Sequence, residues 1–381
     1  MDISKRPPEN YCPFGRTVSN QTIVHLVDRG TRVAFMSYPY DADALRERFG
    51  DQFDTNVSLA RYTSARIGGL ADGLLTAESV EDLVSMVTYL WEEEIPFVVL
   101  GGGSNVLVSD AGVRGLVLLN KARQAVFDIE SEPPTVWAAS GTNFGVIARQ
   151  AASHGLTGLE WASGIPGTIG GAIVGNAGAH GGDVAGNLLL AEILHREIED
   201  IRSEIGKPPL KVVRREEWLA DQFEFSYRSS RIKQKVTGAF EAKEVGLPGR
   251  SEIKQPEVIV VAALFQLAQS SKEEVEARLD ELVAQRRLTQ PFGASLGSMF
   301  KNPEGDYAGS LIEQAGLKGT RVGDAAISSL HANFFINFGN ASATDVWDLI
   351  NLARSVVASK FGVNLELEIE LIGSWEVEQN R

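Results

Sequence analysis

The sequence predicts an α/β (α+β) protein of about two or three domains, and three observations carry that prediction. Segments with the periodicity of strands and of helices alternate along the whole chain. The chain has 381 residues, which is more than one domain usually holds. Of its 38 glycines, 17 lie between Gly101 and Gly182. Glycine costs backbone entropy on folding, so this density marks places where the backbone turns tightly or lies against a ligand.

Capping residues and apolar periodicity predict the individual elements. Ser79 is the expected N-cap of an amphipathic helix over 79–91, and Ser271 with Glu274 forms a capping box before another helix. Further helices are expected at 41–49, 143–154, 310–315 and 345–360. Strands are expected at 31–40, 97–100, 115–119, 136–139, 258–267, 333–337 and 365–372. Segment 188–198 fits a strand or a helix, and segment 233–256 fits a loop or a hairpin insertion.

Composition and charge exclude several classes of function. Lys and Arg number 36 against 50 Asp and Glu, a net charge of −14, which disfavours binding to nucleic acid or to an anionic membrane. Cys12 is the only cysteine, so no intramolecular disulfide or multi-cysteine metal site can form. The five histidines do not pair at ligand spacing, and no metal site is expected. Without a signal-peptide core or a membrane-spanning run, the chain is expected to be cytoplasmic.

The first glycine run, 100–105, directly follows the expected strand 97–100. It consists of Leu100, Gly101, Gly102, Gly103, Ser104 and Asn105. Backbone N–H groups in such a turn can approach a phosphate closely, and the serine and asparagine add side-chain donors. The run matches neither the Walker loop nor the Rossmann fingerprint. Phosphate binding and a simple glycine-rich turn between strands both remain open.

A second glycine-rich stretch covers 164–182, and Pro166 stiffens its first turn. Its small side chains leave a surface that can lie against a large planar or pyrophosphate-bearing cofactor. Close packing of a helix on a strand uses the same residue types and is the alternative. The length of the stretch favours a ligand, although periodicity does not identify which one.

Two polar motifs offer groups for catalysis or binding. Arg228, within 225–230, presents a planar fork of donors for a carboxylate or a phosphate. Ser298 follows a glycine, with Lys301 and Asn302 close behind, although the motif is not a hydrolase nucleophile elbow. The alternatives are a solvated surface arginine and a turn serine with a solvated lysine.

An acidic alternation lies near the C-terminus. In a strand over 365–371, the period of two places three carboxylates on one face, namely Glu366, Glu368 and Glu370. A solvent-facing acidic strand is the ordinary interpretation of such a pattern. The pattern becomes catalytic only if one carboxylate enters a cleft.

Taken together and in this order, the motifs resemble the UDP-N-acetylenolpyruvoylglucosamine reductases of bacterial cell-wall synthesis. The resemblance extends from about residue 56 to residue 373, and the set is far more specific than any single motif. The matching segments are 63–69, 100–105, 158–171, 176–179, 227–228, 290–291, 297–298 with 300–303, 331–334 and 365–368.

The resemblance implies a two-subdomain FAD-binding fold of the vanillyl-alcohol-oxidase type, followed by a C-terminal α+β substrate domain. Residues 1–55 would then be an N-terminal extension of unknown role, and 374–381 a tail. Residues 56–268 would bind FAD, in subdomains of about 56–125 and 126–268, and residues 269–373 would bind substrate. The connection from 258 to 298 resembles the shorter subtype, which lacks an extra substrate-clamping tyrosine loop.

The resemblance also implies the reaction. NADPH would reduce non-covalently bound FAD, and a hydride from flavin N5 would pass to the enolpyruvyl methylene carbon of UDP-N-acetylglucosamine enolpyruvate, giving UDP-N-acetylmuramate. Ser298 would supply the proton as general acid. Arg228 and a protonated Glu368 would stabilise the charge that develops on the substrate. No nucleic-acid or membrane partner is implied, and a monomer or weak homo-oligomer is expected.

Residue by residue, the resemblance assigns further contacts. The flavin ring would lie between the two glycine runs. Substrate would be held by Tyr227, Lys301, Asn302 and Asn333. FAD would be held by Arg66, Gly68, Leu100, Gly101, Gly102, Gly103, Ser104, Asn105, Ser163, Gly164, Ile165, Pro166, Gly167, Thr168, Gly170, Gly171, Asn176 and Gly178.

Two other functions remain open: a related flavoprotein that oxidises a sugar or lactone, and a catalytically silent nucleotide-binding scaffold. The combination of Ser298, Arg228 and Glu368 argues against both. Three features depart from the family pattern. They are the N-terminal extension, the long 233–256 connection, and Glu370, which stands where family members often carry arginine.

Overall fold

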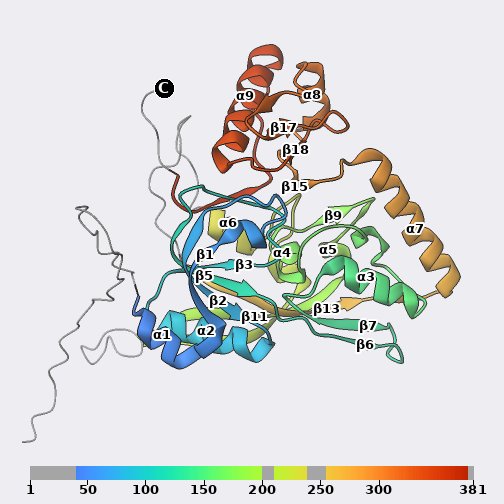
Figure 1. Cartoon of the computed structure of the whole chain (residues 1–381). Coiled ribbons are helices and arrows are strands. Elements are labelled where there is room, and N and C mark those ends of the chain that lie inside the picture. The colour runs from blue at the N-terminus through green and yellow to red at the C-terminus, as the bar shows by residue number, and fades with distance from the viewer. Residues whose placement is uncertain (1–39, 200–209, 238–254, 376–381) are drawn as a thin grey trace, which may run out of the picture.

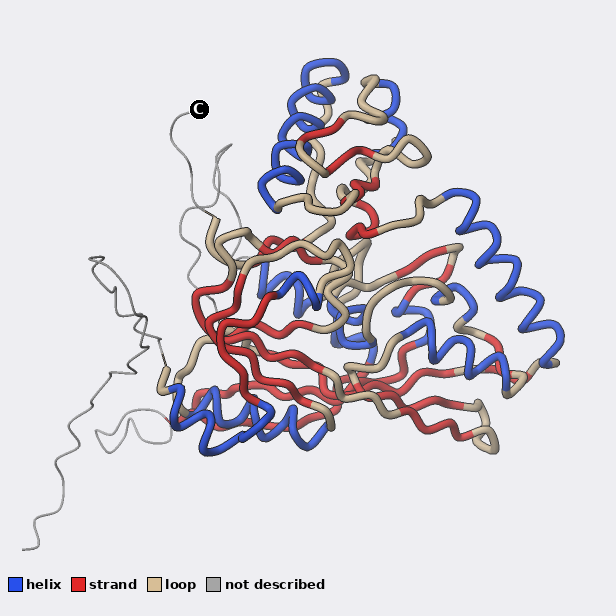
Figure 2. Tube along the Cα trace, viewed as in Figure 1, coloured by secondary structure: helices blue, strands red, loops and turns tan. Residues whose placement is uncertain are grey.

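The computed structural model describes residues 40–199, 210–237 and 255–375, so the expected strand at 31–40 lies almost entirely outside the described residues. In Figure 1 the described chain forms a large α/β body, with a separate lobe that contains α8 (Ala308–Gln314) and α9 (Ala343–Phe361). Figure 2 shows the long helices on the outside of the strands. The domain limits drawn from the sequence stay a prediction.

The first sheet is formed by the N-terminal part of the described chain. Its order is β1-β2-β5-β3, with β1 antiparallel to β2 and the other pairs parallel. The strands are β1 (Phe53–Ser58), β2 (Leu70–Ala77), β3 (Phe97–Leu100) and β5 (Val113–Asn120). Helices α1 (Ala42–Phe49) and α2 (Val80–Glu92) pack against it, and Ser79 caps α2 as predicted. Because β3 and β5 are parallel, both end at the edge where the first glycine run begins.

The second sheet is antiparallel throughout, in the order β12-β11-β13-β7-β6. Its strands are β6 (Ala125–Asp128), β7 (Thr135–Ala139), β11 (Leu188–Glu199), β12 (Leu210–Leu219) and β13 (Val258–Gln266). The ambiguous segment 188–198 is a strand because β12 and β13 hydrogen-bond to it on both sides. Helices α3 (Phe144–Ser153), capped by Asn143, and α4 (Ile169–Val174) pack on this sheet.

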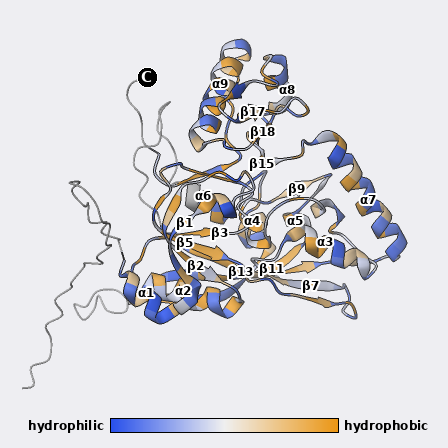
Figure 3. Ribbon diagram, viewed as in Figure 1, coloured by the Kyte–Doolittle hydropathy of each residue, from blue (hydrophilic) through white to orange (hydrophobic). Residues whose placement is uncertain are grey.

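Helix α7 (Lys272–Thr289) leads from the second sheet to the C-terminal lobe, and Ser271 caps its first turn. Much of its surface is hydrophilic (Figure 3), and only Val275, Leu279 and Leu282 are buried. The lobe contains a sheet in the order β15-β18-β17-β16, packed against α8 and α9. Its strands are β15 (Ala294–Ser298), β16 (Arg321–Val322), β17 (Ala325–Ile327) and β18 (Phe334–Asn337).

The chain then returns to the first half of the molecule, where β19 (Glu370–Ile372) pairs in parallel with β4 (Val106–Val108). The prediction of one continuous strand over 365–372 is therefore wrong for residues 365–369. There the chain crosses from the lobe to the first half, and a single bridge between Phe300 and Leu367 replaces a continuous ladder. This crossing brings Glu368 between the two halves of the molecule.

Segment 233–256 is not entirely a loop. Its first residues belong to helix α6 (Arg231–Thr237), whereas residues 238–254 lie outside the described ranges. The remaining short elements are β8 (Leu156–Thr157), β9 (Gly178–Ala179), β10 (Gly182–Asp183), β14 (Ala268–Gln269) and α5 (Val184–Asn187). Helix α6 begins three residues after Arg228, so the chain that follows the Arg228 segment is helical.

Candidate active site

The two glycine runs contact each other directly. A Cβ atom at Gly102 would lie 3.1 Å from the Cα of Gly167, and one at Gly101 would lie 2.4 Å from Oγ1 of Thr168. Ser104 Oγ also donates a hydrogen bond to the Pro166 carbonyl at 3.1 Å. The expectation that a flavin ring lies between the runs is therefore wrong at these residues, because no gap separates them. Their shared edge is what remains available to a ligand.

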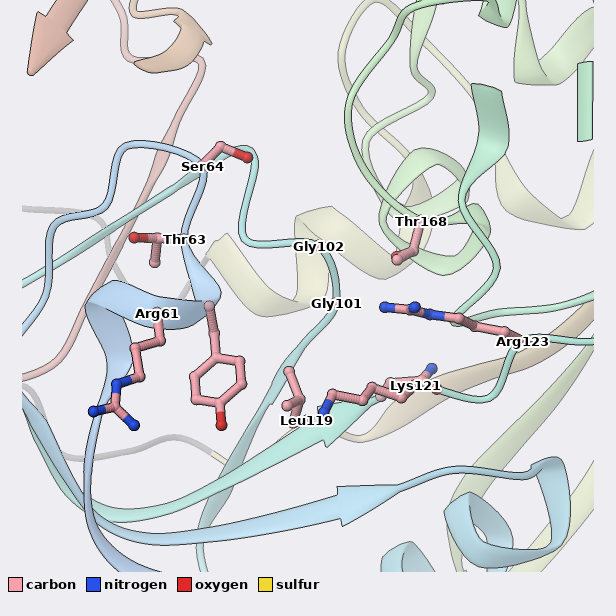
Figure 4. A pocket seen from close by; sticks show the side chains of 11 residues that line it. Arg61, Thr63, Ser64, Gly101, Gly102, Leu119, Lys121, Arg123 and Thr168 are labelled. Carbon is pink, nitrogen blue, oxygen red and sulfur yellow. The ribbon is translucent and has the colours of Figure 1, made fainter. Parts of the chain in front are cut away.

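A cavity of about 230 Å³ opens at that edge (Figure 4). Its lining includes Gly101, Gly102 and Thr168, three of the residues predicted to bind the cofactor. The other lining residues are Arg61, Tyr62, Thr63, Ser64, Leu119, Asn120, Lys121 and Arg123. Three of the lining side chains are cations and none is a carboxylate, so the cavity suits an anionic group. In Figure 4 the Arg123 guanidinium extends toward Gly101 and Thr168.

The sequence did not predict the three cations. Arg61 lies in the turn after β1, while Lys121 and Arg123 follow the end of β5. A signal was present, because basic residues that follow a strand ending beside a glycine run lie where a phosphate would bind. That inference requires knowing that β5 lies beside β3, which the local sequence does not reveal.

The second glycine run carries a buried hydroxyl. Ser163 is 1% exposed, and its Oγ has no hydrogen-bond partner among the described residues. Next to it, a Cβ atom at Gly164 would lie 3.2 Å from Cδ of Arg286, a residue in the last turn of α7. Burial lowers the pKa of Arg286, and within the described part of the chain this cation has no acidic partner. Both groups can therefore serve a ligand.

Arg228 lies at the tip of a tight turn. The backbones of Ser226 and Ser229 exchange two hydrogen bonds of 3.0 and 3.1 Å, which leaves Tyr227 and Arg228 between them. Arg228 has a φ of +55°, an unusual conformation for a residue with a side chain. Its Nη1 donates to the Gly178 carbonyl at 3.1 Å. The turn thus points the guanidinium back toward the second glycine-rich stretch.

Arg228 also forms an ion pair with Glu368 across the two halves of the molecule. Arg228 Nε lies 2.7 Å from Glu368 Oε1, and the side chains are 26% and 16% exposed. Burial raises the pKa of Glu368, and the positive charge of Arg228 is the main opposing influence. The backbone N–H of Glu368 donates to the Met299 carbonyl at 2.9 Å. Since Ser298 precedes Met299, the structure places the backbone of Ser298 beside Glu368, which is paired with Arg228.

Asn333 has a different position from the one predicted. Its side chain is 3% exposed, accepts from the Phe300 N–H at 2.9 Å and donates to the Phe300 carbonyl at 2.8 Å. The Asn333 carbonyl accepts from Met299 N–H at 2.8 Å. Both ends of the amide are occupied, so the prediction of a direct substrate contact is wrong. Asn333 instead holds the chain that follows Ser298.

The other predicted substrate residues lie on the open side of this cluster. Tyr227 is 56% exposed, and its hydroxyl accepts from the Asn302 N–H at 3.5 Å. Lys301 Nζ lies 3.4 Å from Glu366, and Asn302 Oδ1 accepts from the Ala308 N–H at 3.2 Å. The structure therefore places Tyr227, Lys301 and Asn302 next to one another, while their contact with substrate stays a prediction.

Several residues assigned to FAD serve the protein itself. Leu100 is buried, a Cβ atom at Gly68 would lie 3.0 Å from Val108, and one at Gly170 would lie 3.1 Å from Ser140. These three positions are explained by packing. Packing explains the residue type at each position, and the role of each as a cofactor contact stays a prediction.

Two asparagines assigned to FAD instead hold the catalytic segments. Asn176 donates to the Ser226 carbonyl at 3.1 Å and accepts from the Ala185 N–H at 3.2 Å, which fixes the Arg228 turn. Asn105 Nδ2 donates to the Glu368 carbonyl at 3.0 Å. Their amides are therefore engaged within the protein rather than free for FAD. For Arg66, Gly103, Ser104, Ile165, Pro166, Gly167, Gly171 and Gly178 the cofactor role stays a prediction.

Two absences concern the described residues only. No helix in ranges 40–199, 210–237 and 255–375 is long and apolar enough to cross a membrane. In the same ranges, no three His, Cys, Asp or Glu side chains gather as a metal ion would require. His331 instead accepts a hydrogen bond from the Asn333 N–H at 3.2 Å, and burial lowers the pKa of its ring.

Comparisons with known proteins identify the family. The FAD binding domain matches residues 71–193, and the C-terminal domain of UDP-N-acetylenolpyruvoylglucosamine reductase matches residues 289–372. The UDP-N-acetylenolpyruvoylglucosamine reductase of Chloroflexus aurantiacus is 37% identical over 314 residues, covering 82% of this chain and 95% of that protein. The one of Bacillus subtilis is 35% identical over 331 residues, covering 86% of this chain and 97% of that protein.

A solved structure leads to the same family. The UDP-N-acetylenolpyruvylglucosamine reductase (MurB) from Thermus caldophilus matches with a TM-score of 0.62 at 34% identity, covering 83% of this chain and 97% of that one. With the FAD binding domain match, this confirms the predicted fold class, an FAD-binding fold followed by a C-terminal α+β domain. The chain therefore belongs to the UDP-N-acetylenolpyruvoylglucosamine reductase family of FAD-dependent oxidoreductases.

Proposed function

We propose that this chain reduces UDP-N-acetylglucosamine enolpyruvate to UDP-N-acetylmuramate, a peptidoglycan precursor, with Ser298, Arg228 and Glu368 as its catalytic residues. The observation that carries the proposal is the meeting of these residues, from three distant parts of the chain, next to the second glycine-rich stretch. The reaction would take place in the cytoplasm, with a monomer or weak homo-oligomer as the active form. NADPH would be the reductant.

The residues present fit a dinucleotide cofactor. Arg61, Lys121 and Arg123 give the cavity a positive charge that suits a pyrophosphate, and the adjacent glycines expose backbone N–H groups. Ser163 and Arg286 offer unused donors of the kind that the oxygens and nitrogens of a flavin ring accept. Bound FAD would supply the chemistry, accepting electrons from NADPH and delivering a hydride to the enolpyruvyl methylene carbon.

Arg228 is the group suited to the substrate carboxylate. Its planar guanidinium can hold a carboxylate through two parallel hydrogen bonds, which also fixes the orientation of the double bond. In the structure Arg228 is paired with Glu368, so an incoming carboxylate competes with that side chain. Negative charge that spreads onto the substrate carboxylate during the reaction would then lie against a cation that is already in place.

Glu368 acquires its role through the same competition. Burial already raises its pKa, and Arg228 is the main group that opposes the shift. When the substrate carboxylate engages Arg228, Glu368 loses much of this stabilisation and its pKa rises further. A protonated Glu368 can donate a hydrogen bond to the carboxylate of the substrate, whereas an ionised Glu368 would repel it.

Ser298 would supply the proton. It ends β15, after Gly297 with a φ of +75°, and the Asn333 contacts hold the next two residues. A serine hydroxyl is a weak acid, so it protonates only a strongly basic centre such as the carbanion next to the new C–H bond. Tyr227, Lys301 and Asn302 lie on the open side of the cluster, where they would hold the nucleotide part of the substrate.

The experiment separates the two half-reactions by colour. The purified protein should be yellow, and acid or heat should release FAD from it. Under anaerobic conditions NADPH should bleach the flavin, and the enolpyruvyl nucleotide should restore the colour at a rate consistent with turnover. Formation of UDP-N-acetylmuramate is then measured by chromatography.

Two outcomes contradict the proposal. Bleached flavin that only oxygen restores would indicate a flavoprotein that oxidises a sugar or lactone. A colourless protein that still binds nucleotides would indicate the scaffold. Neither rival explains why an arginine, a buried carboxyl and a serine meet beside the glycine runs.

A further inference from the structure

A second ion pair lies next to the pair of Arg228 and Glu368. Lys233 Nζ lies 2.9 Å from Glu370 Oε1, and the two side chains are 10% and 30% exposed. Lys233 lies in α6, shortly after the Arg228 turn, and Glu370 begins β19, two residues after Glu368. The two ion pairs therefore connect the same two chain segments, 228–233 and 368–370.

Hydrogen bonds hold both segments in place. Ser230 Oγ donates to the Val174 carbonyl at 2.7 Å and accepts from the Lys233 N–H at 3.2 Å, which ties the Arg228 turn to α6. On the other side, the Glu370 N–H donates to the Asn105 carbonyl at 2.8 Å. The Asn105 side chain donates to the Glu368 carbonyl. Hydrogen bonds thus hold the two backbone segments that carry the four charged side chains.

We infer that Lys233 and Glu370 are positioning residues that together control when Glu368 is protonated, an inference that rests on the proposed role of Glu368. Lys233 alone would favour the ionised form of Glu368, whereas Glu370 compensates the charge of Lys233. Glu368 can then respond mainly to Arg228, the cation that the substrate carboxylate would engage. The ion pair of Lys233 and Glu370 therefore leaves the protonation of Glu368 sensitive to substrate binding.

The cations around Glu368 agree with the inference that its protonation responds mainly to Arg228. Within the part of the chain that the structure describes, the cations that act on Glu368 are Arg228, then Lys233 and Lys301. Lys301 has its own carboxylate partner, Glu366, at 3.4 Å. Both secondary cations are therefore compensated. The pKa of Glu368 remains raised because burial outweighs the cations.

The inference predicts shifts of opposite sign. In Glu370→Gln, Lys233 loses the carboxylate that lies 2.9 Å from its Nζ, which strengthens its attraction for the Glu368 carboxylate and lowers the pKa of Glu368. In Lys233→Met the charge of Glu370 is no longer compensated, which raises the pKa of Glu368. A neighbouring charge in a partly buried site changes the protonation equilibrium by about tenfold, or about one pH unit. The double variant should return close to the wild type.

The test measures flavin reoxidation by the enolpyruvyl nucleotide against pH, in rapid-mixing experiments on the FAD-loaded enzyme. Activity that needs protonated Glu368 is lost as pH rises through the pKa of that group. The alkaline limb should therefore move to lower pH in Glu370→Gln and to higher pH in Lys233→Met. Difference infrared spectroscopy reads the Glu368 carboxyl band directly, with Glu368→Gln to assign it, and should show the same two shifts.

Controls keep the test decisive. The exposed pair Lys272–Glu276 on α7 is far from the cluster in sequence, and Lys272→Met should leave the pH profile unchanged. Glu370→Gln keeps the size of the side chain, so it remains informative even if Lys233→Met does not fold. The inference would be overturned if the alkaline limb of the pH profile stayed in place, or if it moved in the same direction in both variants. Failure of the wild type to be reoxidised at any pH would instead refute the proposed function, and the infrared titration would still test the ion pair.

Discussion

The glycine runs and the cluster of Arg228, Glu368 and the Ser298 segment are built in opposite ways. At the runs, function depends on missing side chains, because Cβ atoms at Gly101, Gly102 and Gly103 would lie too close to neighbouring atoms. At the cluster, function depends on charged and polar side chains, held by hydrogen bonds from distant segments. The first region should therefore be sensitive to added atoms, and the second to the loss or the change of one functional group.

The largest effect of losing one functional group is expected at Ser298. Ser298→Ala removes the proposed proton donor and changes the side chain by a single hydroxyl, so reoxidation by the enolpyruvyl nucleotide should slow by about 10²–10⁴-fold. Reduction of the flavin by NADPH should remain close to normal. Rapid-mixing measurements of the two half-reactions distinguish these effects. An equal loss in both half-reactions would mean that Ser298 is structural.

The next largest effect is expected at a glycine. Gly103 has a φ of +58°, and a Cβ atom there would lie 1.9 Å from the Tyr62 carbonyl oxygen. Since the clash is with backbone, Gly103→Ala should destabilise the protein by about 3 kcal/mol or more. Gly362, after α9, has a φ of +70° and nothing within 4 Å of such an atom. There the cost should be only about 1 kcal/mol.

Denaturant titration measures the free energy of unfolding of both glycine variants. If Gly103→Ala and Gly362→Ala lost the same stability, only the backbone conformation would matter at Gly103. The close approach of the first run to Tyr62 would then have no part in stability. FAD content, measured on the same samples, tells whether the loss of stability also releases the cofactor.

The parts of the fold that local sequence determines were predicted well. Ser79 and Ser271 cap their helices as expected, because a cap needs only residues within one turn. The strand at 188–198 could not be distinguished from a helix, because its identity depends on β12 and β13, which are distant in sequence. Long-range pairing has no local signature.

The same limit applies to the site. Arg228, Ser298 and Glu368 could be selected because the resemblance covers their motifs, and the structure brings them together. Asn105 and Asn333 were assigned to ligands, although their amides bond to backbone groups of other segments. An asparagine in a motif looks the same in sequence whether it binds a ligand or holds the chain that does.

A smaller catalytic effect is expected at Arg228. Arg228→Lys keeps the charge but loses the planar fork, so reoxidation should slow by about 10–100-fold while reduction by NADPH changes little. Arg231→Lys is the matched control. Arg231 lies three residues further along the chain, and its Nη1 is 3.9 Å from Glu224 Oε1, a long distance for an ion pair. Rates close to wild type for Arg228→Lys would show that a point charge is sufficient, and would remove the bidentate geometry from the mechanism.

The smallest effect is expected in the cavity beside the glycine runs, where charge is shared among three side chains. Lys121→Ala and Arg123→Ala should each weaken FAD binding by about two- to fivefold, because each cation contributes only part of a solvent-screened attraction. The weakening should diminish at high salt. Fluorescence titration of the apoprotein with FAD measures it, with Lys272→Ala as a control outside the cavity. If the affinity for FAD responds neither to salt nor to either substitution, backbone N–H groups alone hold the diphosphate. The glycine runs would then bind their ligand through the backbone only, whereas the cluster around Arg228 acts through side chains.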